Sequence, residues 1–160
     1  MKRYVWTSLP LAGGLVAAIG LAWWAYPPRA EAHCQVPCGI YDDAARIARM
    51  REDSTTIAKA ITNINELAGQ HHSGQVINQA VRWVDTKESH ASHIITVVSE
   101  YFLAQKVKPV TEGQEGFDAY LRSLADHHAV IVAAMKTKQD ADPATVEALN
   151  KAIDALAKHY

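Results

Sequence analysis

Hydrophobic residues recur at spacings of three and four along four stretches of the chain, which is the pattern of amphipathic helices. No stretch shows a convincing alternation of period two, so strands are not expected. The apolar positions of the four stretches are, in order, Ile47, Met50, Ile57, Ile61, Ile64 and Ala68; Ile77, Val81, Val84, Ala91, Ile95, Val98 and Phe102; Phe117, Leu121, Leu124, Ile131 and Met135; and Val146, Leu149, Ile153, Leu156 and Tyr160.

Helix-breaking and helix-capping residues separate these stretches. Gly69 is the expected stop of the first helix, and the second ends before Pro109. Asp142 is a candidate N-cap of the fourth helix, with Pro143 at its first position. Four amphipathic helices with short connections predict an all-α fold, an antiparallel up-and-down four-helix bundle.

The first 32 residues have the pattern of a leader that is removed. Met1-Lys2-Arg3 is followed by an uncharged stretch from Tyr4 to Pro28 and then by Ala30-Glu31-Ala32, a small-x-small cleavage site. A permanent membrane anchor is the alternative, since Val5 to Tyr26 would span roughly 33 Å as a helix. Residues 1–32 are therefore expected to be a signal peptide, cleaved after Ala32, and residues 33–160 the functional domain.

Composition narrows the class of protein. The chain is 49% hydrophobic and 21% charged, which is typical of a folded domain rather than of a disordered one. Its 16 basic and 17 acidic side chains provide no general basic surface for nucleic acid. Loss of the leader makes the net charge of -1 more negative, so attraction of an anionic substrate would have to be local.

The chemistry is concentrated in a short segment ahead of the first helix, residues 33–41, which we call the hook. It contains His33 and both cysteines of the chain, Cys34 and Cys38. Two thiolates and an imidazole bind soft and borderline metals, and the spacing is not Cys-x-x-Cys. After cleavage, His33 would also offer its α-amine, and the peptide nitrogen of Cys34 could be deprotonated. Two nitrogens and two sulfurs in a plane, with an imidazole above, suit nickel or copper better than zinc.

The hook resembles a known metal-binding motif. His33-Cys34-x-x-Pro37-Cys38-Gly39-x-Tyr41 is similar to the nickel hook of the nickel superoxide dismutase family. The resemblance continues through Arg82-Trp83-Val84, Lys87-Glu88-x-His90-Ala91 and Glu100-Tyr101-Phe102, and covers most of residues 33 to 124.

The resemblance implies an enzyme with a defined set of site residues. By this resemblance it would be an oxidoreductase that converts superoxide to dioxygen and hydrogen peroxide as one nickel ion per subunit cycles between Ni(II) and Ni(III). Its metal ligands would be the amine and imidazole of His33, the thiolate and backbone nitrogen of Cys34, and the thiolate of Cys38. Tyr41 and Tyr101 would lie near the open face of the metal. The family also implies a homohexamer and a peptidase that removes the leader.

Several residues differ from the family pattern or allow two interpretations. Gln35 stands where better-known family members have an acidic residue, which is not a metal ligand. Ala48 falls near the position of a glutamate in some members, so we do not expect a salt bridge that anchors the hook to a neighbouring subunit. Glu88 lies on an apolar stripe and allows two interpretations. It either supports the hook or makes an interface contact, or it is an edge residue that reaches solvent. The remaining histidines, among them His90, His93, His127 and His128, lack the Glu-x-x-His motifs of di-iron bundles and are interpreted as single core or surface residues. His71 and His72 are expected in a solvated turn.

Two other functions compete with the dismutase. One is a non-enzymatic bundle, periplasmic or tethered to the membrane by an uncleaved leader, that binds nickel or copper. The other is a structural bundle in which Cys34 and Cys38 form a disulfide. The leader indicates export to the periplasm or the extracellular space, with leader removal inside the cytoplasm as the alternative.

Overall fold

The computed structural model describes residues 42–160, and that part of the chain contains four α-helices in sequence order. The chain divides into two units, residues 1–32 and 33–160, and the described residues belong to the second. The helices are α2 (Asp43–Ala68), α3 (Gly74–Thr96), α4 (Phe117–Gln139) and α5 (Ala144–Leu156); a π-helix η1 (Val97–Lys106) continues α3, and a 3-10 turn η2 (Ala157–His159) follows α5.

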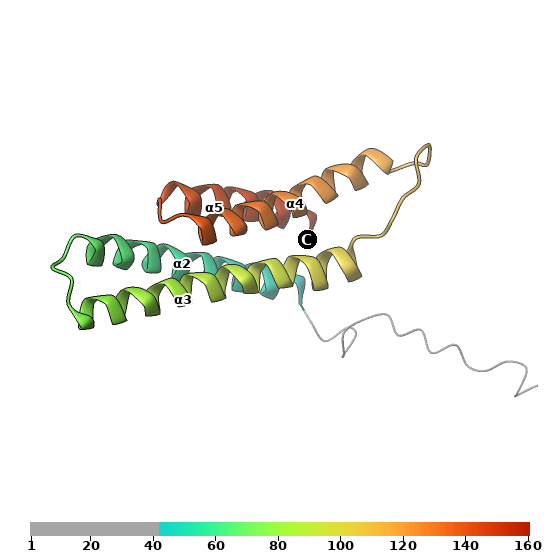
Figure 1. Ribbon diagram of the computed structural model, residues 1–160. Helices are drawn as coiled ribbons and strands as arrows, with labels where there is room; N and C mark the ends of the chain where they lie inside the picture. Colours follow the sequence, from blue (N-terminus) through green and yellow to red (C-terminus); the bar gives the residue numbers. More distant parts are fainter. Residues whose placement is uncertain (1–41) are drawn as a thin grey trace, which may run out of the picture. The chain divides into compact units, whose positions relative to one another are not determined.

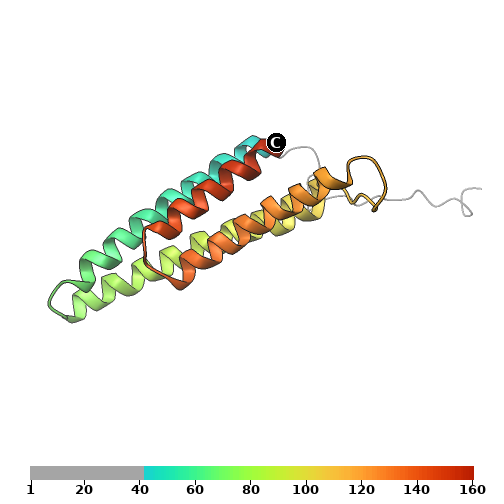
Figure 2. The same ribbon diagram turned by 90° about the horizontal axis from the view of Figure 1, so that it is seen from above.

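The four helices form an antiparallel bundle (Figure 1). Each helix packs against its neighbours along the chain, and α5 closes the arrangement by packing against α2. Seen from above, α5 runs along α2 while α4 runs along α3 (Figure 2). The start of α2, the η1 segment and the C-terminal residues lie at one end of the bundle, which we call the hook end because α2 follows the hook directly. The predicted all-α bundle is confirmed.

Capping residues set the helix boundaries close to the predicted ones. Asp42 accepts hydrogen bonds from the backbone N–H groups of Ala44 (2.8 Å) and Ala45, so α2 begins immediately after the hook. Gly69 is the C-cap of α2, as expected. The last helix begins at Ala144, one residue later than the sequence predicts, and the Asp142 carboxylate accepts the Ala144 N–H at 2.9 Å.

The buried faces of α2 and α5 agree with the sequence pattern. Ile47, Met50, Ile57 and Ile61 of α2 are buried, as are Val146, Leu149, Ile153 and Leu156 of α5. Ile64 is only partly buried and Ala68 is exposed at the end of α2. These two helices therefore contribute the most regular part of the core.

The predicted faces of α3 and α4 are partly wrong. In the first half of α3, Ile77 and Val81 are 53% and 62% exposed. The core residues come later, in the second half of α3 and in η1: Ala91, Ile94, Val97, Val98 and Phe102. In α4, Leu121 and Met135 are exposed, whereas the buried face is His127, Val130, Ala134 and Thr137. That face keeps helical spacing, but hydropathy alone does not recognise it because two of its members are polar.

The backbone of the second helix changes at Val97. The sequence pattern predicts a single α-helix to Phe102, but residues 97–106 form a π-helix, whose hydrogen bonds span five residues; the Val107 N–H donates to the Phe102 carbonyl at 3.0 Å. Such segments are rare and frequently occur at functional sites. This one carries Tyr101 and Phe102 at the hook end.

A buried lysine completes the C-terminal end of α4. Lys87 of α3 is 4% exposed, and its ammonium donates to the carbonyl oxygens of Thr137 (2.6 Å), Lys138 (2.7 Å) and Asp140 (3.2 Å). These carbonyls lack partners within the helix, so the lysine satisfies them and complements the helix dipole. Glu88 beside it is partly exposed and lies 3.4 Å from the Lys138 ammonium, which matches the edge-residue interpretation.

His127 is a fully buried imidazole with both ring nitrogens bonded. Nδ1 lies 2.6 Å from the Ser123 carbonyl oxygen and Nε2 lies 2.8 Å from the Tyr160 hydroxyl. Because a carbonyl can only accept, Nδ1 carries the proton and Nε2 accepts from Tyr160. Burial lowers the pKa of His127 below the ordinary 6.5.

Among the helices of residues 42–160, none has the length and apolar character needed to cross a bilayer.

His127 should make stability depend on pH. Its pKa is lower in the folded than in the unfolded chain, so the unfolded chain binds more protons as the pH falls below 6.5. The free energy of unfolding should therefore decrease as the pH falls from 7 through the lowered pKa, and level off below it. Urea unfolding across this range should show a weaker decrease in His127→Gln. The same change at exposed His128 is the control, and equal profiles for His127→Gln and the parent would contradict this role.

Candidate metal centre

The predicted metal ligands precede the first described helix. His33, Cys34, Cys38 and Tyr41 lie outside the described residues, 42–160. The predicted site residue within that range is Tyr101, at the hook end. Tyr101 and the residues that hold it are therefore the described part of the predicted site.

Asp43, the first residue of α2, links the start of that helix to the π-helix. Its carboxylate accepts a hydrogen bond from the Tyr101 hydroxyl at 2.6 Å and lies 2.9 Å from the Lys106 ammonium. Tyr101 and Lys106 come from η1, and Asp43 is only two residues beyond Tyr41. The Tyr101 hydroxyl is thus fixed to the segment of chain that leads out of the hook.

Two cations lie over the ring of Tyr101. The Arg46 guanidinium is 5.3 Å from the ring centroid, and the Lys106 ammonium is 5.6 Å from it. Cations at such distances are attracted to the face of an aromatic ring. Together with Asp43 they hold Tyr101 in one orientation at the hook end.

Burial and the Asp43 carboxylate raise the pKa of Tyr101 above its ordinary value of 10.0. The same carboxylate, through its bond to the ammonium, raises the pKa of Lys106. At neutral pH Tyr101 is therefore a protonated phenol that donates to Asp43, and Lys106 is a cation. Tyr101 can act there as a polar group and proton carrier, but not as a phenolate.

A second polar cluster lies between α2 and α3. The buried carboxylate of Asp53 lies 2.7 Å from His90 Nδ1 and 2.6 Å from His93 Nδ1. The sequence analysis interpreted these two histidines as single residues. In the structure they share one carboxylate, that of Asp53. Within residues 42–160 no group of three or more His, Cys, Asp or Glu side chains is arranged to hold a metal ion. His71 and His72 are exposed, as expected.

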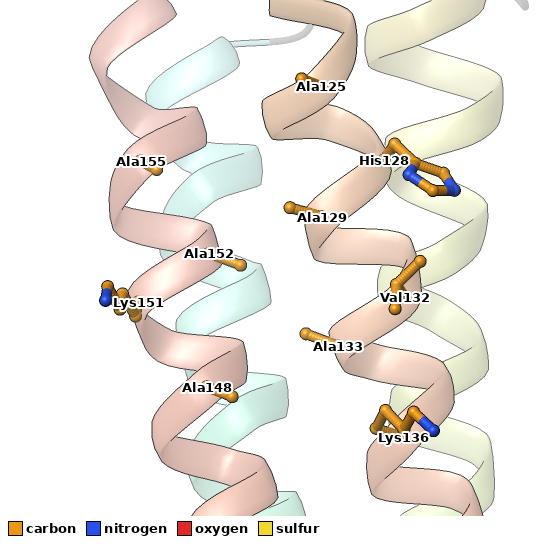
Figure 3. A pocket seen from close by; sticks show the side chains of 10 residues that line it. All are labelled: Ala125, His128, Ala129, Val132, Ala133, Lys136, Ala148, Lys151, Ala152 and Ala155. Atoms are coloured by element: carbon orange, nitrogen blue, oxygen red, sulfur yellow. The ribbon is translucent and has the colours of Figure 1, made fainter.

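The surface groove between α4 and α5 has a different chemistry. It encloses about 590 Å³ and is lined mainly by alanines, with Lys136, Lys151 and His128 among the other lining residues (Figure 3). It contains no thiol, carboxylate or phenol, and it shares no lining residue with the Tyr101 cluster. The groove therefore lacks the thiolates that are predicted to bind the metal.

One protein family matches both the hook residues and the bundle. The family model for nickel-containing superoxide dismutase matches residues 28–160, a range that includes His33, Cys34 and Cys38. The chain belongs to the nickel-containing superoxide dismutase family. It is accordingly a nickel-dependent oxidoreductase. No curated protein and no solved structure gives a match.

The donor set of the hook fits nickel. The residues predicted to bind the metal are two cysteines and a histidine, and their sulfur and nitrogen atoms are donors that would suit nickel. The described residues contribute Tyr101, Asp43, Arg46 and Lys106 beside the attachment point of the hook. Sequence reasoning identified Tyr101 through the family pattern but missed Asp43, which looks like an ordinary acidic residue in a first helical turn.

Replacement of Asp43 should change the titration of Tyr101. In Asp43→Asn the carboxylate charge that raises the Tyr101 pKa is lost, so this pKa should move down toward 10.0 while the contribution of burial remains. NMR of the protein labelled with ¹³C at tyrosine Cζ would follow each phenol separately. Asp42→Asn, which removes the neighbouring carboxylate charge and keeps a side chain able to cap α2, is the control and should leave Tyr101 unchanged. An unaltered Tyr101 titration in Asp43→Asn would contradict the described contact.

Proposed function

We propose that the mature protein disproportionates superoxide to dioxygen and hydrogen peroxide at a nickel site formed by the hook. The observation that carries the proposal is the family match, which extends through the hook as well as the bundle. Nickel supplies the one-electron chemistry by alternating between its II and III states. The chain's own residues bind the nickel ion, set its redox potential and transfer protons to the substrate.

The ligands would be the amine and imidazole of His33, the thiolate and backbone nitrogen of Cys34, and the thiolate of Cys38. Anionic sulfur and amide donors stabilise a higher oxidation state than water does, and the imidazole adds to this. The free amine exists only when residues 1–32 have been removed, so the site depends on cleavage after Ala32. Removal by a signal peptidase would accompany export to the periplasm or the extracellular space.

Tyr101 and its neighbours would serve the approach of substrate and protons. Tyr41 and Tyr101 are proposed to lie near the open face of the metal, and the Tyr101 hydroxyl keeps its proton in a hydrogen bond to Asp43. The net charge of the chain does not attract superoxide, so attraction has to come from local cations. Arg46 and Lys106, which lie over the Tyr101 ring, are the candidates.

A homohexamer is proposed from the family resemblance. Large apolar side chains remain exposed on the described surface, among them Ile77 and Val81 of α3 and Leu121 of α4. Contact with further copies of the chain would cover such residues. Sedimentation of the mature protein would measure the assembly.

The hook and the bundle should be separable by mutation. Cys34→Ser or Cys38→Ser should abolish nickel binding and superoxide dismutation, because serine does not replace a thiolate ligand. Helical content should stay unchanged, because α2 begins at Asp43 with its own cap and its core residues start at Ile47. Metal analysis, a dismutation assay and circular dichroism would measure the three properties.

Gln35→Ala is the matched control, since it changes the hook without changing a proposed ligand. It should retain nickel and activity. Activity that survives loss of either thiol would exclude the proposed ligand set. Loss of helical structure in the cysteine variants would instead indicate a structural role for the cysteines.

A further inference from the structure

The phenol of Tyr160, which is 38% exposed, and the buried imidazole of His127 form a pair that the proposed dismutation does not use. The Tyr160 hydroxyl donates to His127 Nε2 at 2.8 Å, while His127 Nδ1–H donates to the Ser123 carbonyl at 2.6 Å. The second bond fixes the tautomer, so the lone pair of Nε2 faces the phenol. A base therefore stands in line with the phenolic proton.

This arrangement suits the one-electron oxidation of a tyrosine. A phenol that loses an electron becomes a strong acid, so its oxidation is easiest when a hydrogen-bonded base takes the proton in the same step. Partial burial, assisted by the charge of Asp43, raises the pKa of Tyr160, so the phenol does not ionise beforehand. Burial also keeps His127 neutral at pH 7, with its lone pair available.

Access and surroundings support the same chemistry. Tyr160 lines a cavity of about 330 Å³ together with Lys106, His159 and Tyr120, through which a small oxidant can reach it. Its ring lies 4.4 Å from that of Phe102, which in turn lies 5.1 Å from the ring of Tyr101. The pair is thus in contact, through Phe102, with the tyrosine of the proposed site.

We propose that Tyr160 and His127 are a redox-active pair, at which one-electron oxidation of the protein by a small oxidising radical comes to rest. The radical takes one electron from Tyr160 and is reduced to its anion. The phenolic O–H bond breaks, the proton moves to His127 Nε2, and a neutral tyrosyl radical hydrogen-bonded to an imidazolium remains. An external one-electron reductant such as ascorbate would return the electron, and transfer of the same proton back to the phenolic oxygen would restore the starting pair.

The pair can be tested on the full chain without nickel, so the outcome is independent of the proposed dismutation. Azidyl radicals, generated by pulse radiolysis, would oxidise tryptophan and tyrosine side chains. Freeze-quenched samples would then be examined by electron paramagnetic resonance for tyrosyl radicals. We expect a persistent tyrosyl signal in the parent, and loss of most of it in Tyr160→Phe, which keeps the ring against Phe102.

Tyr120→Phe is the matched control, because Tyr120 lines the same cavity and no hydrogen bond from its hydroxyl to a histidine is found in residues 42–160. It should retain the persistent radical. His127→Phe should form the radical at Tyr160 but shorten its lifetime, because no base remains to hold the proton. A signal in Tyr160→Phe that equals the parent's in yield and lifetime, or an equal loss in Tyr120→Phe, would overturn the proposal.

A second measurement uses the unaltered protein and does not depend on the folding of any variant. Electron–nuclear double resonance in D₂O should detect a strongly coupled exchangeable deuteron in the parent's radical, which is the proton shared with His127. A parent radical without such a deuteron would equally overturn the assignment.

Discussion

Burial of Phe102 is the contact on which the hook end of this bundle depends. It is the largest fully buried side chain in the described core, and its ring meets Tyr101, His127 and Tyr160. The η1 segment, α4 and the C-terminal residue are thereby packed around one apolar ring. This packing also sets the position of the Tyr101 side chain, because Tyr101 is the neighbour of Phe102 on the π-helix. Its hydroxyl then reaches the Asp43 carboxylate.

The described bundle contains the hydrophobic core, and the chemistry is proposed to lie in the hook. The helix that follows the hook is held in place by contacts at the end of the bundle. Asp42 caps that helix, and Asp43 ties its first turn to Tyr101 and Lys106 across the bundle end. The family match covers both the hook residues and the bundle, and the described contacts give the proposed metal-binding segment a helical support to follow it.

The sequence predicted the fold class, the order of the helices and the buried faces of α2 and α5, where Ile, Leu, Val and Met mark the core. It predicted the face of α4 about one position away from the observed one, because His127 and Thr137 are buried with their polar atoms satisfied. The π-helix has no hydropathy signal, so the change of backbone at Val97 could not be foreseen. Asp43 with Tyr101, and Asp53 with His90 and His93, are contacts between residues far apart in the chain, which periodicity does not pair. The hook was identified by residue types and spacing alone, and its ligands stay a prediction.

The central claim is that the working protein begins at His33 and holds nickel there. Mass spectrometry of the purified native protein, with determination of its N-terminal residue and of its bound metal in the same sample, tests this directly. We expect a chain that starts at His33 and carries one nickel ion. A purified, active protein that still begins with the leader, or one that starts at His33 and carries no nickel, would contradict it.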